Sequence, residues 1–120
     1  MKETGLWING AWREASETYD LKAPYDGKLL AKIAKGTAED VKVAIAGAEQ
    51  AFHSFKKWTA YDRAEMLYKV VNIMRERKEE LSKILAQEAG KPLKTARAEV
   101  DRTIATYQFS AEEAKQYRGE

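Results

Sequence analysis

The sequence contains no cysteine. This absence excludes a disulfide scaffold, a cysteine-ligated zinc site and a cysteine nucleophile within these 120 residues. Histidine occurs once, at His53, so no second histidine is present for a metal cluster or for a second catalytic role. His53 also lies between Phe52 and Phe55 in an expected helix, which favours packing or solvent contact over catalysis.

Other signals of particular functions are also missing. The sequence has neither the G-x-G-x-x-G nor the G-x-x-x-x-G-K-[ST] pattern of a phosphate-binding loop. No apolar run approaches the roughly 20 residues of a membrane helix, and the polar N-terminus predicts no signal peptide. We therefore expect a cytoplasmic protein without a membrane partner. The 21 basic and 19 acidic side chains are spread evenly, which disfavours a nucleic-acid partner.

The patterns that are present begin with strands and turns. Asn9-Gly10 separates two short apolar segments, 6–8 and 11–13, and this dipeptide is the strongest local signal for a β-hairpin. Two further strands are expected over 18–23 and 29–34, with a turn between them. Residues 1–36 are therefore predicted to form a β ribbon with turns.

Residues 37–120 are predicted to be helical. Thr37 and Thr59 are expected N-caps of two amphipathic helices, the first of which ends near Trp58. The polar stretch 75–80 predicts a bend, and Gly90 followed by Pro92 predicts a helix end. A last helix is expected over 93–117. The fold class is thus α+β, with a β ribbon followed by long amphipathic helices and no complete parallel sheet.

Several side chains are candidate sites. Trp7 and Trp12 on the hairpin favour hydrophobic anchoring of the ribbon over a ligand platform. The charged residues of 75–80 favour a solvated, mutually paired surface. Arg102 lies near the Val100–Ile104 line of the last helix and is expected to be the charge closest to a packed face. Its spacing alone favours a solvated or ion-paired side chain.

The helices are also expected to expose apolar surface. Such faces drive association when nothing covers them, so we expect a self-associated chain, although a bundle of the three helices is the alternative. The three faces run through Ile45, Phe52 and Phe55, through Leu67, Val71 and Met74, and through Val100, Ile104 and Tyr107.

Eight groups of residues, in order and spacing, resemble the N-terminal region of the aldehyde dehydrogenases. They are Ile8-Asn9-Gly10-Ala11-Trp12, Ala23-Pro24-Tyr25-Asp26-Gly27, Thr37-Ala38-Glu39-Asp40-Val41, Ala51-Phe52 with Trp58, Arg63-Ala64 with Leu67, Glu88 with Gly90-Lys91-Pro92, Glu99-Val100, and Tyr117-Arg118-Gly119-Glu120. Each motif is weak alone, but together they cover nearly the whole chain. The turn at 23–27 departs from the family's usual Asn-Pro-x-Thr-Gly.

The resemblance implies the first part of an NAD(P)-binding domain. A parent enzyme of this family oxidises an aldehyde to an acid, using a cysteine nucleophile, a glutamate that activates water and NAD or NADP as hydride acceptor. In the family these catalytic and cofactor-binding residues come later in the sequence. We therefore expect a truncated chain that has no catalytic or cofactor-binding residue of its own and is inactive alone. The parent enzyme is expected to be a homo-oligomer.

Within the family, segments 99–103, 111–114 and 118–120 most resemble one branch. It handles small aldehydes bearing a hydroxyl, phosphate or phosphonate, and it includes lactaldehyde dehydrogenase and non-phosphorylating glyceraldehyde-3-phosphate dehydrogenase. The branch has an arginine at the position of Arg102, which implies a substrate-binding role. Glu88 matches a position that in some members helps to bind a structural monovalent cation. The backbone carbonyl at the position that matches Lys22 is near that cation.

A free-standing helical interaction module, descended from the family, is the alternative from another class. A nucleic-acid-binding helical domain is a third possibility, and the even charge speaks against it. The DNA downstream of codon 120 separates the first two, since a continuing frame that encodes a glycine-rich loop and a cysteine would identify a dehydrogenase.

Overall fold

The computed structural model describes residues 2–117. The chain divides into two compact units, Met1–Lys57 and Trp58–Glu120, which are described one at a time. The first unit contains all the described strands and one helix, and the second contains three helices. This is the α+β composition that the sequence predicts, with strands ahead of helices. Arg118-Gly119-Glu120, which closes the family resemblance, lies outside the described residues.

The first unit contains a hairpin and a small three-stranded sheet. The strands are β1 (Lys2–Thr4), β2 (Leu6–Ile8), β3 (Ala11–Arg13), β4 (Thr18–Lys22) and β5 (Leu29–Ala34). Strands β2 and β3 pair antiparallel, and the two turn residues between them have positive φ, 54° at Asn9 and 75° at Gly10. The predicted hairpin is therefore confirmed, and positive φ at both central residues is what a type I′ turn requires.

The other three strands form a mixed sheet in the order β1-β5-β4. Strand β4 pairs antiparallel with β5, while β1 pairs parallel with β5. The sequence did not predict β1, because a polar segment shows no alternation of apolar and polar residues. Its position depends on backbone pairing with β5. In the β4–β5 turn, Gly27 has φ 71° and donates its amide hydrogen bond to the Ala23 carbonyl at 2.9 Å.

Helix α1 (Ala38–Phe55) follows the sheet. Thr37 is its N-cap, as predicted: the Asp40 amide donates to the Thr37 hydroxyl at 3.2 Å, and the Thr37 amide donates to the Asp40 carboxylate at 2.9 Å. This reciprocal capping box satisfies two helix-end donors. The hydrogen bonds from the Thr37 amide and hydroxyl lower the pKa of the Asp40 carboxyl below its ordinary value.

The apolar face of α1 is largely uncovered in this chain. None of its residues is buried, and the exposed fractions are 63% at Ile45 and 58% at Phe52. Its contact with the hairpin lies near Gly47, where an added Cβ atom would overlap the side chain of Asn9. The hairpin turn thus approaches the α1 backbone closely at this one glycine.

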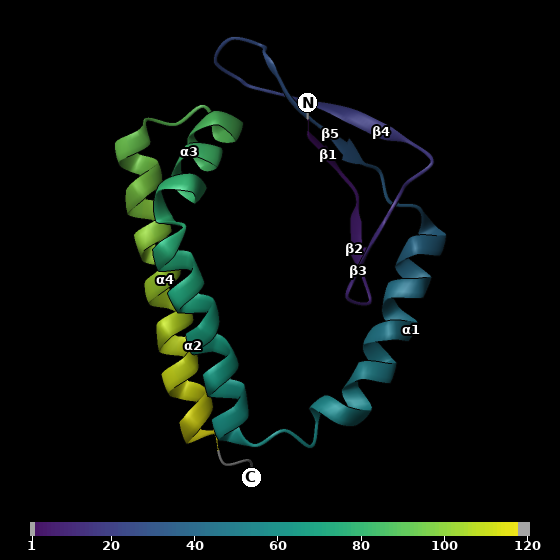
Figure 1. The fold of residues 1–120 in the computed structure, drawn as a ribbon, viewed down its shortest axis with the longest axis vertical. Helices are drawn as coiled ribbons and strands as arrows, with labels where there is room; N and C mark the ends of the chain where they lie inside the picture. The colour runs from purple at the N-terminus through teal and green to yellow at the C-terminus, as the bar shows by residue number, and fades with distance from the viewer. Residues whose placement is uncertain (1, 118–120) are drawn as a thin grey trace. The chain divides into compact units, whose positions relative to one another are not determined.

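The second unit consists of α2 (Ala60–Glu76), α3 (Lys78–Ala89) and α4 (Leu93–Gln116). Thr59 caps α2 through a second capping box, and Gly90, at φ 63°, ends α3 in the left-handed conformation. Both boundaries were predicted. Figure 1 shows α2 and α4 lying side by side along most of their length, with α3 packed near one end of the pair.

The core of this unit lies between its three helices. Val71, Val100 and Ile104 are buried, and partly buried hydrophobic residues of α2 and α3 pack against them. The expectation that three apolar faces would lack cover is therefore wrong for α2 and α4, whose faces cover each other. Tyr107, expected on the α4 face, is 40% exposed. None of the described helices is both long enough and apolar enough to span a membrane.

Candidate functional site

Helix α4 places Arg102 on its exposed side. Val100 and Ile104, which are both buried, lie two residues before and after it. Two residues correspond to about 200° around an α-helix, so Arg102 projects from the side opposite the core. The expectation that Arg102 would be the charge closest to a packed face is therefore wrong, because residues two apart in sequence lie on opposite sides of a helix.

The surroundings of Arg102 on the helix are small and mostly uncharged. Side chains three or four residues away are the ones that face it, and these are Ala98, Glu99, Ala105 and Thr106. Glu99 is the only acid among the four. The Thr106 hydroxyl donates to the Arg102 backbone carbonyl at 3.0 Å, so it is already engaged with the helix backbone. Glu99 is thus the natural intrahelical partner for the guanidinium.

Glu99 is nevertheless bound elsewhere. Its carboxylate accepts a hydrogen bond from Lys91 Nζ at 2.7 Å, and this ion pair is partly shielded from solvent. Lys91 belongs to the short connection between α3 and α4. Within residues 2–117, the structure shows no ion pair or side-chain hydrogen bond at the Arg102 guanidinium. Arg102 is therefore an exposed cation, and its acidic neighbour Glu99 is paired with Lys91 instead.

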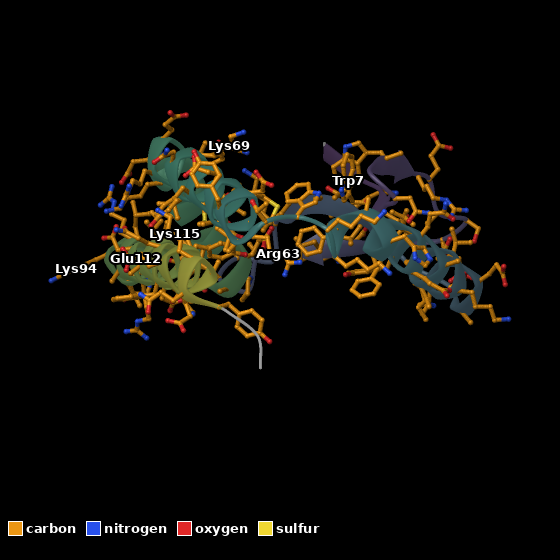
Figure 2. The ribbon with its side chains drawn as sticks, turned by 90° about the horizontal axis from the view of Figure 1, so that it is seen from below. Trp7, Arg63, Lys69, Lys94, Glu112 and Lys115 are labelled. Atoms are coloured by element: carbon orange, nitrogen blue, oxygen red, sulfur yellow. The ribbon has the colours of Figure 1, made fainter. Side chains whose placement is uncertain are left out.

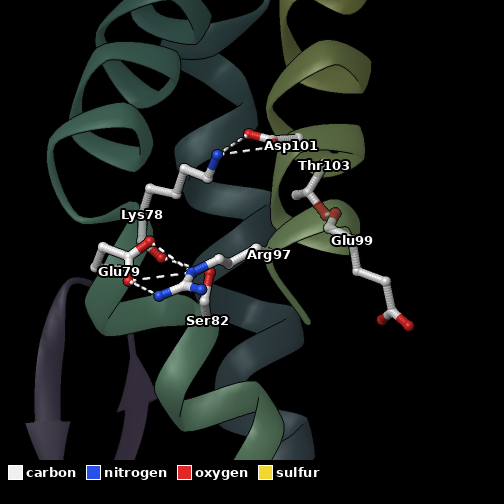
Figure 3. Close-up of polar contacts among 7 residues, drawn as sticks. All are labelled: Lys78, Glu79, Ser82, Arg97, Glu99, Asp101 and Thr103. Atoms are coloured by element: carbon white, nitrogen blue, oxygen red, sulfur yellow. Dashed lines mark hydrogen bonds and ion pairs between the residues drawn. The ribbon is translucent and has the colours of Figure 1, made fainter. Parts of the chain in front are cut away.

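Two further ion pairs join α3 to α4 (Figure 3). Lys78 Nζ lies 2.7 Å from a carboxylate oxygen of Asp101. The Arg97 guanidinium holds Glu79 with two parallel hydrogen bonds, from Nε at 2.9 Å and from Nη2 at 2.8 Å. Hydrogen bonding by Arg97 lowers the pKa of the Glu79 carboxyl, and the same pairing raises the pKa of Arg97. Asp101, which precedes Arg102, is thereby also engaged by α3.

The stretch 75–80 was predicted to form pairs within itself. That prediction holds for Arg77 and Glu80, whose atoms Nη2 and Oε1 lie 2.7 Å apart. Lys78 and Glu79 instead reach across to α4, which the sequence did not reveal. Buried Ser82, whose hydroxyl donates to the Lys78 carbonyl at 2.7 Å, provides a small side chain in this helix.

Glu88, the second candidate residue, lies in the last turn of α3 and is exposed. No cluster of three or more His, Cys, Asp or Glu side chains suited to a metal ion occurs among the described residues. Lys22, whose carbonyl the resemblance associates with the same cation, belongs to the first compact unit. The prediction for Glu88 therefore stays a prediction.

The other side chains considered from the sequence are exposed. Trp7 and Trp12 make an edge-to-face contact with ring centroids 5.0 Å apart, and they are 60% and 65% exposed. Both rings are therefore only partly covered within the first unit. His53 is exposed on α1.

A groove of about 590 Å³ in the second unit lies away from the predicted residues. It is bounded by the start of α2 and the end of α4, and it includes neither Arg102 nor Glu88. Its lining consists of Trp58, Ala60, Arg63, Ser110, Glu113, Ala114 and Tyr117.

Sequence comparisons point to one family. Residues 12–120 match the model of the aldehyde dehydrogenase family. The chain is 38% identical over 120 residues to 3-sulfolactaldehyde dehydrogenase of Priestia aryabhattai, covering 100% of this chain and 25% of that enzyme. It is 37% identical over 115 residues to lactaldehyde dehydrogenase of Methanocaldococcus jannaschii, covering 96% of this chain and 25% of that enzyme.

Solved structures agree. The structure of PnpE in complex with nicotinamide adenine dinucleotide superposes with a TM-score of 0.93 at 31% identity, covering 98% of this chain and 25% of that one. The chain therefore belongs to the aldehyde dehydrogenase family. It has the fold of the first part of such an enzyme, and it spans about a quarter of the length of the relatives it matches.

Proposed function

We propose that this chain is the N-terminal segment of an NAD- or NADP-dependent aldehyde dehydrogenase. Its substrate would be a small aldehyde bearing a hydroxyl or an anionic group, of the lactaldehyde or glyceraldehyde-3-phosphate type. The enzyme would be a cytoplasmic homo-oligomer. Support for the substrate class comes from the similarity of nearly the whole chain to 3-sulfolactaldehyde and lactaldehyde dehydrogenases.

Arg102 is the residue through which this segment would contact the substrate. The single observation that carries the proposal is its exposed guanidinium on α4, without an acidic partner among the described residues. A guanidinium can hold a phosphate, sulfonate or carboxylate with two parallel hydrogen bonds, which fixes orientation as well as position. A phosphate at the far end of the substrate would thus be held while the aldehyde reaches a nucleophile outside this chain.

The junction between β5 and α1 does not fit the pyrophosphate of a dinucleotide cofactor. The junction from β5 to α1 is a strand-to-helix turn, the usual place for a pyrophosphate, but it contains only one glycine, Gly36. The helix N-terminus there is already occupied by the Asp40 carboxylate, which accepts from the Thr37 amide and hydroxyl at 2.9 and 2.8 Å. A phosphate would meet a negative charge at that position. We therefore propose no cofactor-binding residue in this chain.

We also propose Glu88 as one ligand of a structural monovalent cation. The exposed carboxylate provides one oxygen, and the described residues contain no group of three or more acidic, histidine or cysteine side chains suited to a metal ion. Backbone carbonyls would have to complete the site. Thermal unfolding of the full-length enzyme in potassium and in choline chloride tests this role, because Glu88→Gln should abolish any stabilisation that is specific to potassium.

The test of Arg102 is the variant Arg102→Leu in the full-length enzyme. The KM for glyceraldehyde-3-phosphate should rise about tenfold or more, since a charge-assisted contact is worth roughly 1.5–3 kcal/mol. Kinetics with propanal, a neutral aldehyde, should change little. Lys94→Leu is the matched control, because Lys94 is an exposed cation on the first turn of the same helix and points away from it (Figure 2). Equal losses with both aldehydes would assign Arg102 a structural role.

A free-standing interaction module is the second candidate function. The uncovered apolar residues of α1 and the exposed Trp7–Trp12 pair are the observations in its favour. The same surfaces are expected in a dehydrogenase segment whose remaining sequence packs on them. The two candidates differ in the size of the natural polypeptide, which is measurable.

A further inference from the structure

We propose that Lys91 is a positioning residue for anion binding, acting through Glu99: it holds the Glu99 carboxylate away from Arg102 and so leaves the guanidinium open to an anionic ligand. This inference rests on the proposed role of Arg102 as the substrate-anion contact. It adds a residue that touches neither the substrate nor Arg102.

The geometry of α4 makes Glu99 the competitor. A glutamate three residues before an arginine on an exposed helix face is close enough to form a weak ion pair with it. Of the four side chains one turn away from Arg102, only Glu99 carries a negative charge. An Arg102 paired with Glu99 would have to break that pair before it could bind a substrate anion. The observed structure avoids this cost, because Glu99 is paired with Lys91 at 2.7 Å.

The remaining nearby acids are also occupied. Asp101 is held by Lys78, and Glu79 is held by Arg97. In Figure 3 the Glu99 carboxylate points away from these two pairs, so it lies on another side of α4. No cation from α3 that appears in that view engages it. Lys91, placed by the turn at Gly90, is the cation that the structure provides for Glu99.

The arrangement distinguishes Arg102 from the arginine one turn and a half earlier on the same helix. Arg97 is held by both oxygens of the Glu79 carboxylate, and it therefore has a structural partner. Arg102 has no such partner among residues 2–117. Arg97 is thus fastened to α3 by Glu79, whereas the pair that Lys91 of the connection forms with Glu99 bears on Arg102 alone.

The test follows the Nε–Hε resonance of Arg102 in the isotopically labelled 120-residue chain during titration with inorganic phosphate at constant ionic strength. The wild-type resonance should shift, while that of Arg97 should not. Lys91→Met should raise the half-saturating phosphate concentration about two- to threefold, because Glu99 then competes for the guanidinium with the energy of a helix ion pair. Lys91→Arg should behave as the wild type.

A rescue experiment separates this role from simple bracing. Lys91→Met/Glu99→Gln should return phosphate affinity to the wild-type value, although it leaves the bridge broken. Lys91→Met/Glu112→Gln restores the same net charge at a distant exposed acid on α4, and it should stay as weak as Lys91→Met. If Lys91→Met does not fold, Glu99→Gln alone decides, since it should bind phosphate at least as tightly as the wild type.

Several results would overturn the proposal. They are an unresponsive Arg102 resonance in the wild type, unchanged affinity in Lys91→Met, failure of rescue by Glu99→Gln, and equal rescue by Glu112→Gln. The experiment uses neither aldehyde nor cofactor. A full-length enzyme that oxidises no aldehyde would therefore refute the proposed function while these measurements still report on the Lys91–Glu99 pair.

Discussion

Gly47 on α1 offers a sharp test of how the hairpin meets the helix. A Cβ atom at this position would overlap all three outer side-chain atoms of Asn9. Asn9 is the first of the two turn residues and has φ 54°. Gly47→Ala should therefore force the turn away from the helix or drive the Asn9 side chain into another rotamer.

Two effects of opposite sign determine the size of the change. Alanine in a helix interior is favoured over glycine by about 0.8–1 kcal/mol. Overpacking of a close contact costs about 1–3 kcal/mol. The net effect of Gly47→Ala should be a loss of about 1 kcal/mol in the free energy of unfolding.

The variant Asn9→Gly provides the matched background, because glycine keeps the positive φ and removes the obstructing side chain. In that background, Gly47→Ala should stabilise the chain by about 0.8–1 kcal/mol through helix propensity alone. Urea unfolding, followed by tryptophan fluorescence and by circular dichroism, measures the wild type, the two single variants and the double variant. Stabilisation by Gly47→Ala in both backgrounds would refute the close contact.

Three further outcomes are expected for the chain itself. In the folded chain the pKa values of Asp40 and Glu79 lie below their ordinary values, so both ionised carboxylates stabilise the fold above about pH 4. Helicity should therefore fall as the pH drops through these lowered pKa values. Unchanged circular dichroism down to about pH 2 would contradict this. Calorimetric titration should detect no binding of NAD+ or NADP+, and micromolar affinity would overturn the assignment of the cofactor site to later sequence. Sedimentation equilibrium at tens of micromolar should give a mass above that of the 13.6 kDa monomer, because the apolar face of α1 is uncovered. A folded monomer that binds no apolar dye would contradict this expectation.

Local signals predicted most of the element boundaries. Thr37 and Thr59 act as N-caps, Asn9-Gly10 forms the hairpin turn and Gly90 ends a helix, since each of these residues works through atoms only a few positions away. Strand β1 was not predictable, because its pairing with β5 depends on a segment nearly thirty residues later.

The candidate site was less accessible from sequence. Arg102 was selected through the family resemblance, and its position on α4 was misjudged because residues two apart face opposite sides of a helix. The partners of Glu79, Asp101 and Glu99 depend on how α3 and its connection pack on α4, which charge patterns alone do not encode. A periodicity count that assigned every residue to a helical angle would have placed Arg102 correctly, but it would not have found Lys91.

The size of the natural polypeptide tests the central claim most directly. Because the segment covers a quarter of its dehydrogenase relatives, the natural polypeptide should have about four times the mass of this 13.6 kDa chain. Its sequence beyond residue 120 should include a cysteine nucleophile and a glycine-rich loop. Mass spectrometry of the intact protein from its source cells, together with the coding sequence beyond codon 120, measures this. A stop codon after Glu120 and a stable natural product of 13.6 kDa would contradict the proposal and identify a free-standing module.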